Sequence, residues 1–161
     1  MLQNITISPM NPGNFNEAKR MMEISFAASM HDFPDNYGAN HDPEDLPSID
    51  GILEKTEETP LVFYQDKKMV GGAVLTIKDD NHNILSLLFV DSDYLNRGIG
   101  YRAWLEIEKR YPQTKTWTTI TPPVLMRNVY FYVNKCGFQM IRVEDPKSDE
   151  PMFVFQKVMT K

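Results

Sequence analysis

One stretch of the chain, residues 84–111, constrains the fold more than any other, because it reads as a strand, a turn and a helix in succession. Apart from Ser86, residues 84–90 are all apolar, and an apolar run of this length is typical of a buried strand. After the turn, apolar and small residues recur at helical spacing and so share one face: Gly100, Ala103, Trp104, Ile107 and Tyr111. The other elements are expected to assemble around this unit.

The turn inside this unit has the features of an anion site. Residues 95–100 read Leu-Asn-Arg-Gly-Ile-Gly and end where the helix begins. A helix N-terminus offers unpaired N–H groups and the positive end of the helix dipole, which together favour phosphate. Gly98 and Gly100 allow a ligand to approach the backbone closely, and Arg97 adds a positive charge. The pattern predicts a phosphate site, although glycines that merely form a tight turn remain the alternative.

The composition predicts an ordinary globular protein with one domain over residues 1–161. Charged residues make up 24% of the chain and hydrophobic residues 42%. A net charge of −5 argues against a nucleic-acid surface. No apolar run reaches the roughly 20 residues that span a bilayer, and the start of the chain lacks the pattern of a signal peptide. The single cysteine, Cys136, fits a reducing cytoplasm, and the three histidines lack metal-ligand spacing.

Turn residues divide the rest of the chain into short elements. Further strands are predicted at residues 4–8, 61–65, 69–77, 115–120, 138–144 and 152–158, and further helices at 14–30, 46–56 and 124–135. Asn14 is expected to cap the first helix, and Gly137 to end the last one. The pair Gly71-Gly72 inside a strand indicates a bulge or a close backbone contact.

The order of these elements predicts the fold class. Three consecutive strands joined by tight turns must be antiparallel, whereas the strand–helix–strand unit around Gly98 implies a parallel pair. The predicted order is β-α-α-β-β-β-α-β-α-β-β. We therefore expect a mixed α/β (α+β) domain, with a mostly antiparallel sheet and helices on both faces.

Two sequence blocks resemble those of a known enzyme family. Residues 90–100, Val-Asp-Ser-Asp-Tyr-Leu-Asn-Arg-Gly-Ile-Gly, resemble the acetyl-CoA signature of the GCN5-related N-acetyltransferases (GNAT), in which Q/R-x-x-G-x-G/A leads into a helix. Residues 127–138, Arg-Asn-Val-Tyr-Phe-Tyr-Val-Asn-Lys-Cys-Gly-Phe, look like the later motif of the family, in which an asparagine precedes F-Y-x-K-x-G-F. The resemblance is strongest from Leu61 to Val143. It implies a single GNAT-like domain that transfers acetyl from acetyl-CoA to a primary amine of a small molecule or peptide.

The resemblance also implies roles for individual positions. In the family, the turn holds the pyrophosphate of the cofactor, and backbone groups at the end of the preceding strand bond the pantetheine arm and the acetyl oxygen. The implied cofactor-binding residues are Leu88, Phe89, Val90, Leu95, Asn96, Arg97, Gly98, Ile99, Gly100, Tyr101, Asn128 and Tyr132. Tyr132 is the candidate general acid for the departing thiolate. A backbone amide aimed at the developing oxyanion is the main electrostatic device of the family.

Two departures from the family pattern bear on these roles. Leu95 stands where the signature has Gln or Arg, so one side-chain contact is lost. The second block is one residue longer than the usual spacing. Counting back from Gly137 puts Val133 at the tyrosine position, whereas counting forward from Asn128 puts Tyr132 there. Tyr132 is favoured because Val133 has no proton to give.

The proton acceptor and the amine are less well indicated. Asp91, the pair Asp79-Asp80, His82 or a relayed water are all open as general base. Residues 42–58 are strongly acidic and would attract a cationic amine, although a solvated face on an acidic protein is the commoner explanation. Cys136 is expected to pack at a helix end, because transfer in the family is direct.

Two other classes of protein are weighed against the enzyme. A non-catalytic acyl-CoA-binding sensor or scaffold is suggested by the missing base and by Leu95. A nucleotide-binding α/β domain is disfavoured, because Ala103 replaces the third glycine of G-x-G-x-x-G and no G-x-x-x-x-G-K-[ST] occurs. Many relatives in the GNAT family pair as dimers, so a homodimer stays open.

Overall fold

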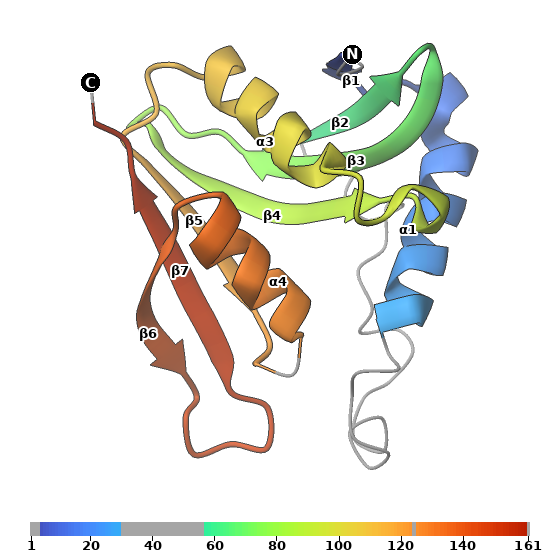
Figure 1. Cartoon of the computed structure of the whole chain (residues 1–161). Coiled ribbons are helices and arrows are strands. Elements are labelled where there is room, and N and C mark those ends of the chain that lie inside the picture. Colours follow the sequence, from blue (N-terminus) through green and yellow to red (C-terminus); the bar gives the residue numbers. More distant parts are fainter. Residues whose placement is uncertain (1–3, 30–56, 124, 161) are drawn as a thin grey trace.

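A computed structural model describes residues 4–29, 57–123 and 125–160. Its centre is one seven-stranded sheet in the order β1-β2-β3-β4-β5-β7-β6 (Figure 1). The strands are β1 (Ile5–Pro9), β2 (Glu58–Gln65), β3 (Lys68–Thr76), β4 (His82–Val90), β5 (Thr116–Thr121), β6 (Gln139–Glu144) and β7 (Met152–Val158). Among these strands β4 and β5 pair parallel, and all other neighbours are antiparallel. The predicted mixed, mostly antiparallel sheet is confirmed.

Helices cover both faces of the sheet, as predicted. The helices are α1 (Phe15–Ser29), α3 (Ile99–Arg110) and α4 (Met126–Tyr130). Trp104 of α3 packs with Leu85 and Tyr132 in one buried cluster on one face. On the other face, Met22 of α1 packs with Phe89 in a second cluster. The helix predicted at residues 46–56 lies outside the described residues, and no described helix is long and apolar enough to cross a membrane.

The entry into α1 differs from the prediction that Asn14 is its cap. A 3-10 turn (Pro12–Asn14) precedes α1, and Asn11 caps this turn. The Asn11 side chain accepts from the Gly13 N–H at 2.9 Å, while the Asn14 side chain accepts from the Asn11 N–H at 3.1 Å. Pro12 at the first position favours such a start, because it has no N–H to satisfy. The capping residue therefore lies three positions earlier than expected.

The glycine pair in β3 makes the close backbone contact that its sequence indicated. A Cβ at Gly71 would clash with the Phe89 carbonyl oxygen on β4. A Cβ at Gly72 would lie 2.6 Å from Cζ of the Phe89 ring. The two glycines allow β4 and the Phe89 ring to pack directly against the backbone of β3, and this contact fixes the C-terminal half of β4.

The second sequence block forms α4 followed by a wider, π-helical turn over Phe131–Lys135. The Cys136 N–H donates to the Phe131 carbonyl five residues back, at 3.0 Å. Gly137 follows with a φ of +85°, which confirms it as the glycine that ends the helix. A π turn accommodates one extra residue within a helix, and such turns often occur at functional sites. The extra residue found in the sequence is therefore absorbed at Phe131–Lys135.

Candidate functional site

The strands β4 and β5 pair over only three residues and then separate. His82, Asn83 and Ile84 pair with Thr116, Trp117 and Thr118. Beyond this point β4 runs on to Val90 with β3 as its strand partner, while β5 continues with β7 as its partner (Figure 1). One edge of β4 is thus left without a strand partner in the described part of the chain. An unpaired edge presents N–H and C=O groups that a bound molecule can use.

The direction of the backbone shows which groups face this opening. The N–H of Asp91 donates to the Val70 carbonyl on β3 at 2.8 Å. Because successive N–H groups of a strand point to opposite sides, those of Leu88 and Val90 point away from β3 and toward the opening. The Phe89 backbone faces β3, and its side chain lies in the cluster beside α1. Of the three strand residues predicted to bind the cofactor, two therefore offer backbone groups to the opening.

A bulge in β4 lies between the strand separation and Leu88. Leu75 is opposite Leu85 and Val74 is opposite Leu87, so Ser86 is the extra residue. Its hydroxyl lies 3.3 Å from that of Thr76. Bulges bend a strand and redirect its backbone groups, and they are frequent beside active sites.

The predicted anion turn connects β4 to α3. Gly98 is the N-cap of α3 with a φ of +76°, and no side chain caps this end. Asn96 also has a positive φ, of +63°. A Cβ at Gly98 would meet nothing within 4 Å, so the backbone there is open to a ligand. Ile99 is buried, whereas Leu95 and Tyr101 are exposed. The turn has the open glycine and uncapped helix start that the sequence predicted.

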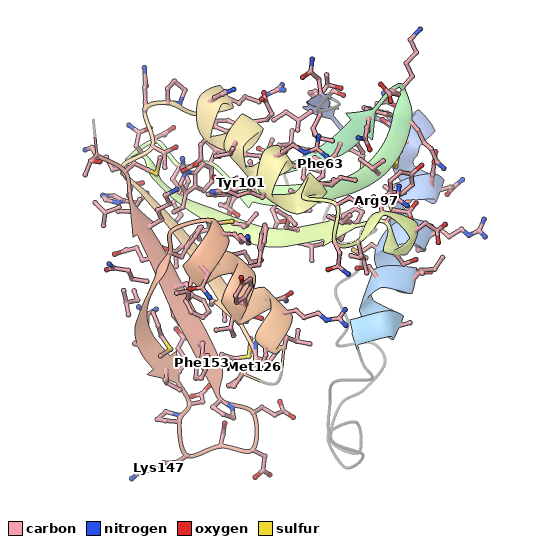
Figure 2. The ribbon with its side chains drawn as sticks, viewed as in Figure 1. Phe63, Arg97, Tyr101, Met126, Lys147 and Phe153 are labelled. Atoms are coloured by element: carbon pink, nitrogen blue, oxygen red, sulfur yellow. The ribbon has the colours of Figure 1, made fainter. Side chains whose placement is uncertain are left out.

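Two positive side chains lie over the ring of Tyr94, the residue directly before this turn. The Arg97 guanidinium carbon lies 5.1 Å from the centre of the Tyr94 ring, and Lys68 Nζ lies 4.9 Å from the same centre. Tyr94 raises the pKa of Lys68. Arg102 Nη2 donates to the Arg97 carbonyl at 3.3 Å. Figure 2 shows Arg97 in the turn and Tyr101 on α3. Lys68 was not singled out in the sequence, because it lies 27 positions before the turn.

The two sequence blocks meet at Gly100. A Cβ on Gly100 would lie 3.3 Å from Cζ of Phe131 and 3.7 Å from Cγ2 of Val90. The end of β4, the start of α3 and the π turn thus converge at one point. Asn128, in α4, donates from Nδ2 to Thr121 Oγ1 on β5 at 3.4 Å. The structure therefore brings most of the predicted cofactor-binding residues to one side of the sheet.

Tyr132 lies deep in this region. Its ring is 7% exposed and has edge contacts with Phe131 and Phe138. Burial raises the pKa of Tyr132 to about 12. Thr119 of β5 donates from Oγ1 to the Leu85 carbonyl of β4 at 2.9 Å. Val133, the alternative at this position, is exposed. Sequence reasoning missed Thr119, because a threonine in a β-branched run is typical of any strand.

The groups considered as general base occupy different places. The Asp91 carboxylate accepts from the Asp93 N–H at 3.0 Å and so caps a short turn at the C-terminal end of β4. His82 Nδ1 is 2.8 Å from Thr116 Oγ1, where β4 and β5 still pair. Leu88 lies six positions after His82 along β4, which is roughly 20 Å. Asp79 and Asp80 precede His82, so these three residues lie at the other end of β4 from the anion turn.

Cys136 is buried at the end of the π turn, as predicted. It is 2% exposed, and burial raises the pKa of its thiol to about 12. Glu108 of α3 and Lys157 of β7 form an ion pair of 2.8 Å nearby. A buried, protonated thiol is a poor nucleophile. In the part of the chain that the structure describes, no group of three or more His, Cys, Asp or Glu side chains is placed to hold a metal ion.

Comparison with known proteins identifies the family. The family model described as Acetyltransferase (GNAT) family matches residues 26–138. The chain belongs to the GNAT acetyltransferase family. A relative in Bacillus subtilis (strain 168), the uncharacterized protein YrkN, is 39% identical over 138 residues, which cover 72% of this chain and 75% of YrkN.

Solved structures of GNAT acetyltransferases have the same fold. An acetyltransferase from Thermus thermophilus superposes with a TM-score of 0.74, at 14% identity and 97% coverage of both chains. The PaiA N-acetyltransferase from Thermoplasma acidophilum, solved in complex with coenzyme A, superposes with a TM-score of 0.72, at 18% identity and with 97% of this chain and 99% of that chain covered. This GNAT protein therefore combines the family fold with the open β4 edge and the anion turn described above.

Proposed function

We propose that this GNAT protein is an acetyl-CoA-dependent N-acetyltransferase that moves an acetyl group directly to a primary amine of a small molecule or peptide. The observation that carries the proposal is the separation of β4 from β5 beyond Ile84–Thr118, beside the uncapped start of α3. An opening with backbone donors on one side and a phosphate-binding helix start next to it suits a long, partly anionic thioester.

The proposal assigns the cofactor to two adjoining regions. Residues 95–101 hold the pyrophosphate through the first amides of α3, with Arg97 and Lys68 supplying positive charge. The backbone of Leu88 to Val90 lines the opening, where the N–H groups of Leu88 and Val90 are placed to bond the pantetheine arm and the acetyl oxygen. Asn128 contacts the same arm. These assignments are supported by the open Gly98 backbone and by the direction of β4.

Acetyl transfer then requires a hydrogen-bond donor to the developing oxyanion and a proton for the departing sulfur. The Leu88 N–H, just beyond the Ser86 bulge, is the proposed donor to the developing oxyanion. Tyr132 is the proposed general acid, since its high pKa keeps it protonated at neutral pH. An amine with a pKa near 10 must first lose a proton. Among the residues considered, Asp91 lies at the appropriate end of β4, and its contact with Asp93 favours a water relay over direct proton transfer.

Three further points belong to the same proposal. The acceptor is a primary amine of a small molecule or peptide. The chain 1–161 works as one acetyltransferase domain in the cytoplasm. An edge strand with exposed apolar residues, β6, is the surface on which a homodimer would form, as its Met140 and Ile141 side chains are 52% and 45% exposed.

A non-catalytic acyl-CoA-binding module is the alternative. It is favoured because the Asp91 carboxylate, the candidate base, already accepts a hydrogen bond from the Asp93 N–H. Calorimetric titration with acetyl-CoA, followed by a thiol assay for free CoA in the presence of an amine panel, separates the two. The panel holds a polyamine, an aminoglycoside and peptides with free N-termini.

The expected result is saturable binding and release of free CoA that depends on one class of amine. Binding of acetyl-CoA without release of free CoA, whichever amine of the panel is added, would favour the non-catalytic acyl-CoA-binding module. No binding by the unmodified protein would refute both, leaving a shared fold without the shared ligand.

A further inference from the structure

Three polar side chains form a row across three neighbouring strands of the sheet. Glu58 on β2 is directly opposite Thr76 on β3. The Thr76 hydroxyl oxygen lies 3.3 Å from that of Ser86, the bulged residue of β4. The side chains of directly opposite residues lie on the same face of a sheet, with their Cβ atoms about 5 Å apart. We call Glu58, Thr76 and Ser86 the polar row.

The polar row lies on the face of the sheet that also carries α1. Leu75 and Leu85, which directly precede Thr76 and Ser86, belong to the buried cluster that contains Trp104 of α3. Successive side chains of a strand point to opposite faces. The side chains of the row therefore point away from α3 and toward the face of α1.

Ser86 brings the row to the opening between β4 and β5. It lies two positions after Ile84, the last β4 residue that pairs with β5, and it is exposed. Leu88, whose N–H points into the opening, lies two positions further on, which is roughly 7 Å along a strand. A group held at the Ser86 hydroxyl is therefore close to the place proposed for the thioester carbonyl.

The carboxylate of Glu58 gives the row its charge. Its Oε2 atom is buried and has no hydrogen-bond partner among the residues that the structure describes. A carboxylate can only accept hydrogen bonds, and a negative charge shielded from water is unfavourable unless a donor or a positive charge lies close to it. A positive group at the hydroxyls of Thr76 and Ser86 would supply that charge.

The three side chains match the needs of a primary ammonium group. Such a group has three N–H donors, no acceptor and one positive charge. The two hydroxyl oxygens have lone pairs that can accept, and the carboxylate adds the negative charge. A carboxylate or phosphate ligand would be repelled by Glu58, and an apolar ligand would leave the hydroxyls without a partner. The row therefore favours a cationic amine over other classes of acceptor.

We propose that the polar row is the subsite for the acceptor, and that it selects amines that are positively charged when they bind. The hydroxyl oxygens of Ser86 and Thr76 accept hydrogen bonds from the ammonium group, and the Glu58 carboxylate balances its charge. Glu58 acts through its electrostatic field at the two hydroxyls, because its Oε2 atom is shielded from the surface. This inference rests on the proposed function and adds the charge class of its acceptor.

The first test measures amine binding without turnover. The protein, with and without saturating free CoA, is titrated calorimetrically with the amines of the panel described above. Glu58→Gln removes the charge and keeps the shape of the side chain, and Glu57→Gln is the matched control, because Glu57 is exposed and adjacent. We expect the Kd of the best amine to rise about 10-fold in Glu58→Gln and to stay within about 2-fold in Glu57→Gln. Ser86→Ala is expected to raise it about 5-fold.

A neutral analogue separates an electrostatic role of Glu58 from a structural one. The alcohol that corresponds to the best amine, with OH in place of NH₂, carries no charge. It should bind the unmodified protein more weakly than the amine does, and it should lose no affinity in Glu58→Gln. Equal losses for the amine and the alcohol would overturn the proposal, as would equal amine affinities in Glu58→Gln and the unmodified protein. Urea midpoints check folding, and Glu58→Gln should not lower the midpoint, because Oε2 has no hydrogen bond to lose.

Steady-state rates distinguish a failure of this inference from a failure of the proposed function. In Glu58→Gln we expect the KM for the amine to rise about 10-fold, with the KM for acetyl-CoA within about 2-fold. Release of CoA with an unchanged KM for the amine would leave the proposed function standing and refute the subsite. Amine binding that Glu58→Gln weakens, without release of CoA, would refute the proposed function and support the cation subsite. Absence of binding by every amine of the panel would overturn the inference.

Discussion

Gly100 and Phe131 are in direct contact, although they belong to different sequence blocks: a Cβ on Gly100 would lie 3.3 Å from Cζ of the Phe131 ring. The absence of a side chain at Gly100 thus has two uses. It leaves the backbone of the α3 start accessible, and it provides the space into which the π turn packs. A larger residue here would disturb both the anion turn and the segment that carries Tyr132.

The contact predicts that Gly100→Val destabilises the protein. Extra methyl groups in a filled space typically cost about 1–3 kcal/mol, and urea unfolding measures this loss. Phe131→Leu in the same chain should restore part of it, because a smaller side chain makes room. Equal midpoints for Gly100→Val and the unmodified protein would contradict the contact.

A charge at Gly98 should weaken acetyl-CoA binding without unfolding the turn. Asn and Asp tolerate a positive φ better than other residues, and a side chain at Gly98 meets open space. Gly98→Asp and Gly98→Asn then differ only in charge. We expect calorimetry to give a Kd about 10-fold weaker for Gly98→Asp than for Gly98→Asn at low salt, because one added charge at a few ångströms costs about 1–2 kcal/mol. The difference should shrink in 1 M salt.

Two buried groups predict a loss of stability at high pH. Burial raises the pKa of the Cys136 thiol from 9.0, and that of the Tyr132 hydroxyl from 10.0, to about 12 each. The unfolded chain therefore releases these protons first. The free energy of unfolding should be unaffected by them below pH 9 and fall above it, by about 1.4 kcal/mol per pH unit for one group. Cys136→Ser should delay the onset to about pH 10, as followed by urea unfolding across this range. An unchanged onset would show that the thiol does not contribute.

The backbone contact at Gly71 predicts a more severe defect than a contact with a side chain. A Cβ there would meet the Phe89 carbonyl oxygen, which cannot rotate away, so Gly71→Ala must push β3 from β4. The expected cost is about 3 kcal/mol. Gly13→Ala is the matched control, because its nearest neighbour is a side-chain atom, Asn11 Oδ1 at 3.2 Å. Thermal unfolding compares the two, and similar midpoints would argue against a rigid β3–β4 contact.

The sequence predicted the order of elements because hydrophobic spacing and turn residues act locally. The strand–turn–helix unit formed as expected, and so did the closing hairpin of β6 and β7. The anion turn could be predicted because glycines at a helix start leave backbone N–H groups open to an anion in any fold. The charge next to it could not be predicted, since Lys68 of β3 approaches the Tyr94 ring only through the fold of the sheet.

The remainder of the site depends on where β4 and β5 separate. Nothing in the strand sequences marks Ile84–Thr118 as the last pair, so the bond from Thr119 to the Leu85 carbonyl became visible only with both strands placed. The cap at Asn11 was also missed, because a proline and a glycine shift the start of the helix. Ser86 was noticed only as a break in an apolar run, whereas the structure makes it the bulged residue.

The π turn also affects how this chain should be aligned with the family motif F-Y-x-K-x-G-F that its second block resembles. An insertion inside a helix normally rotates every later side chain by about 100°, since 3.6 residues complete one turn. Here the wider turn at Phe131–Lys135 confines the insertion to one place. Positions up to Phe131 are therefore equivalent when counted from Asn128, and positions from Cys136 onward when counted from Gly137. A single ungapped alignment across this helix would compare non-equivalent residues in one half of it.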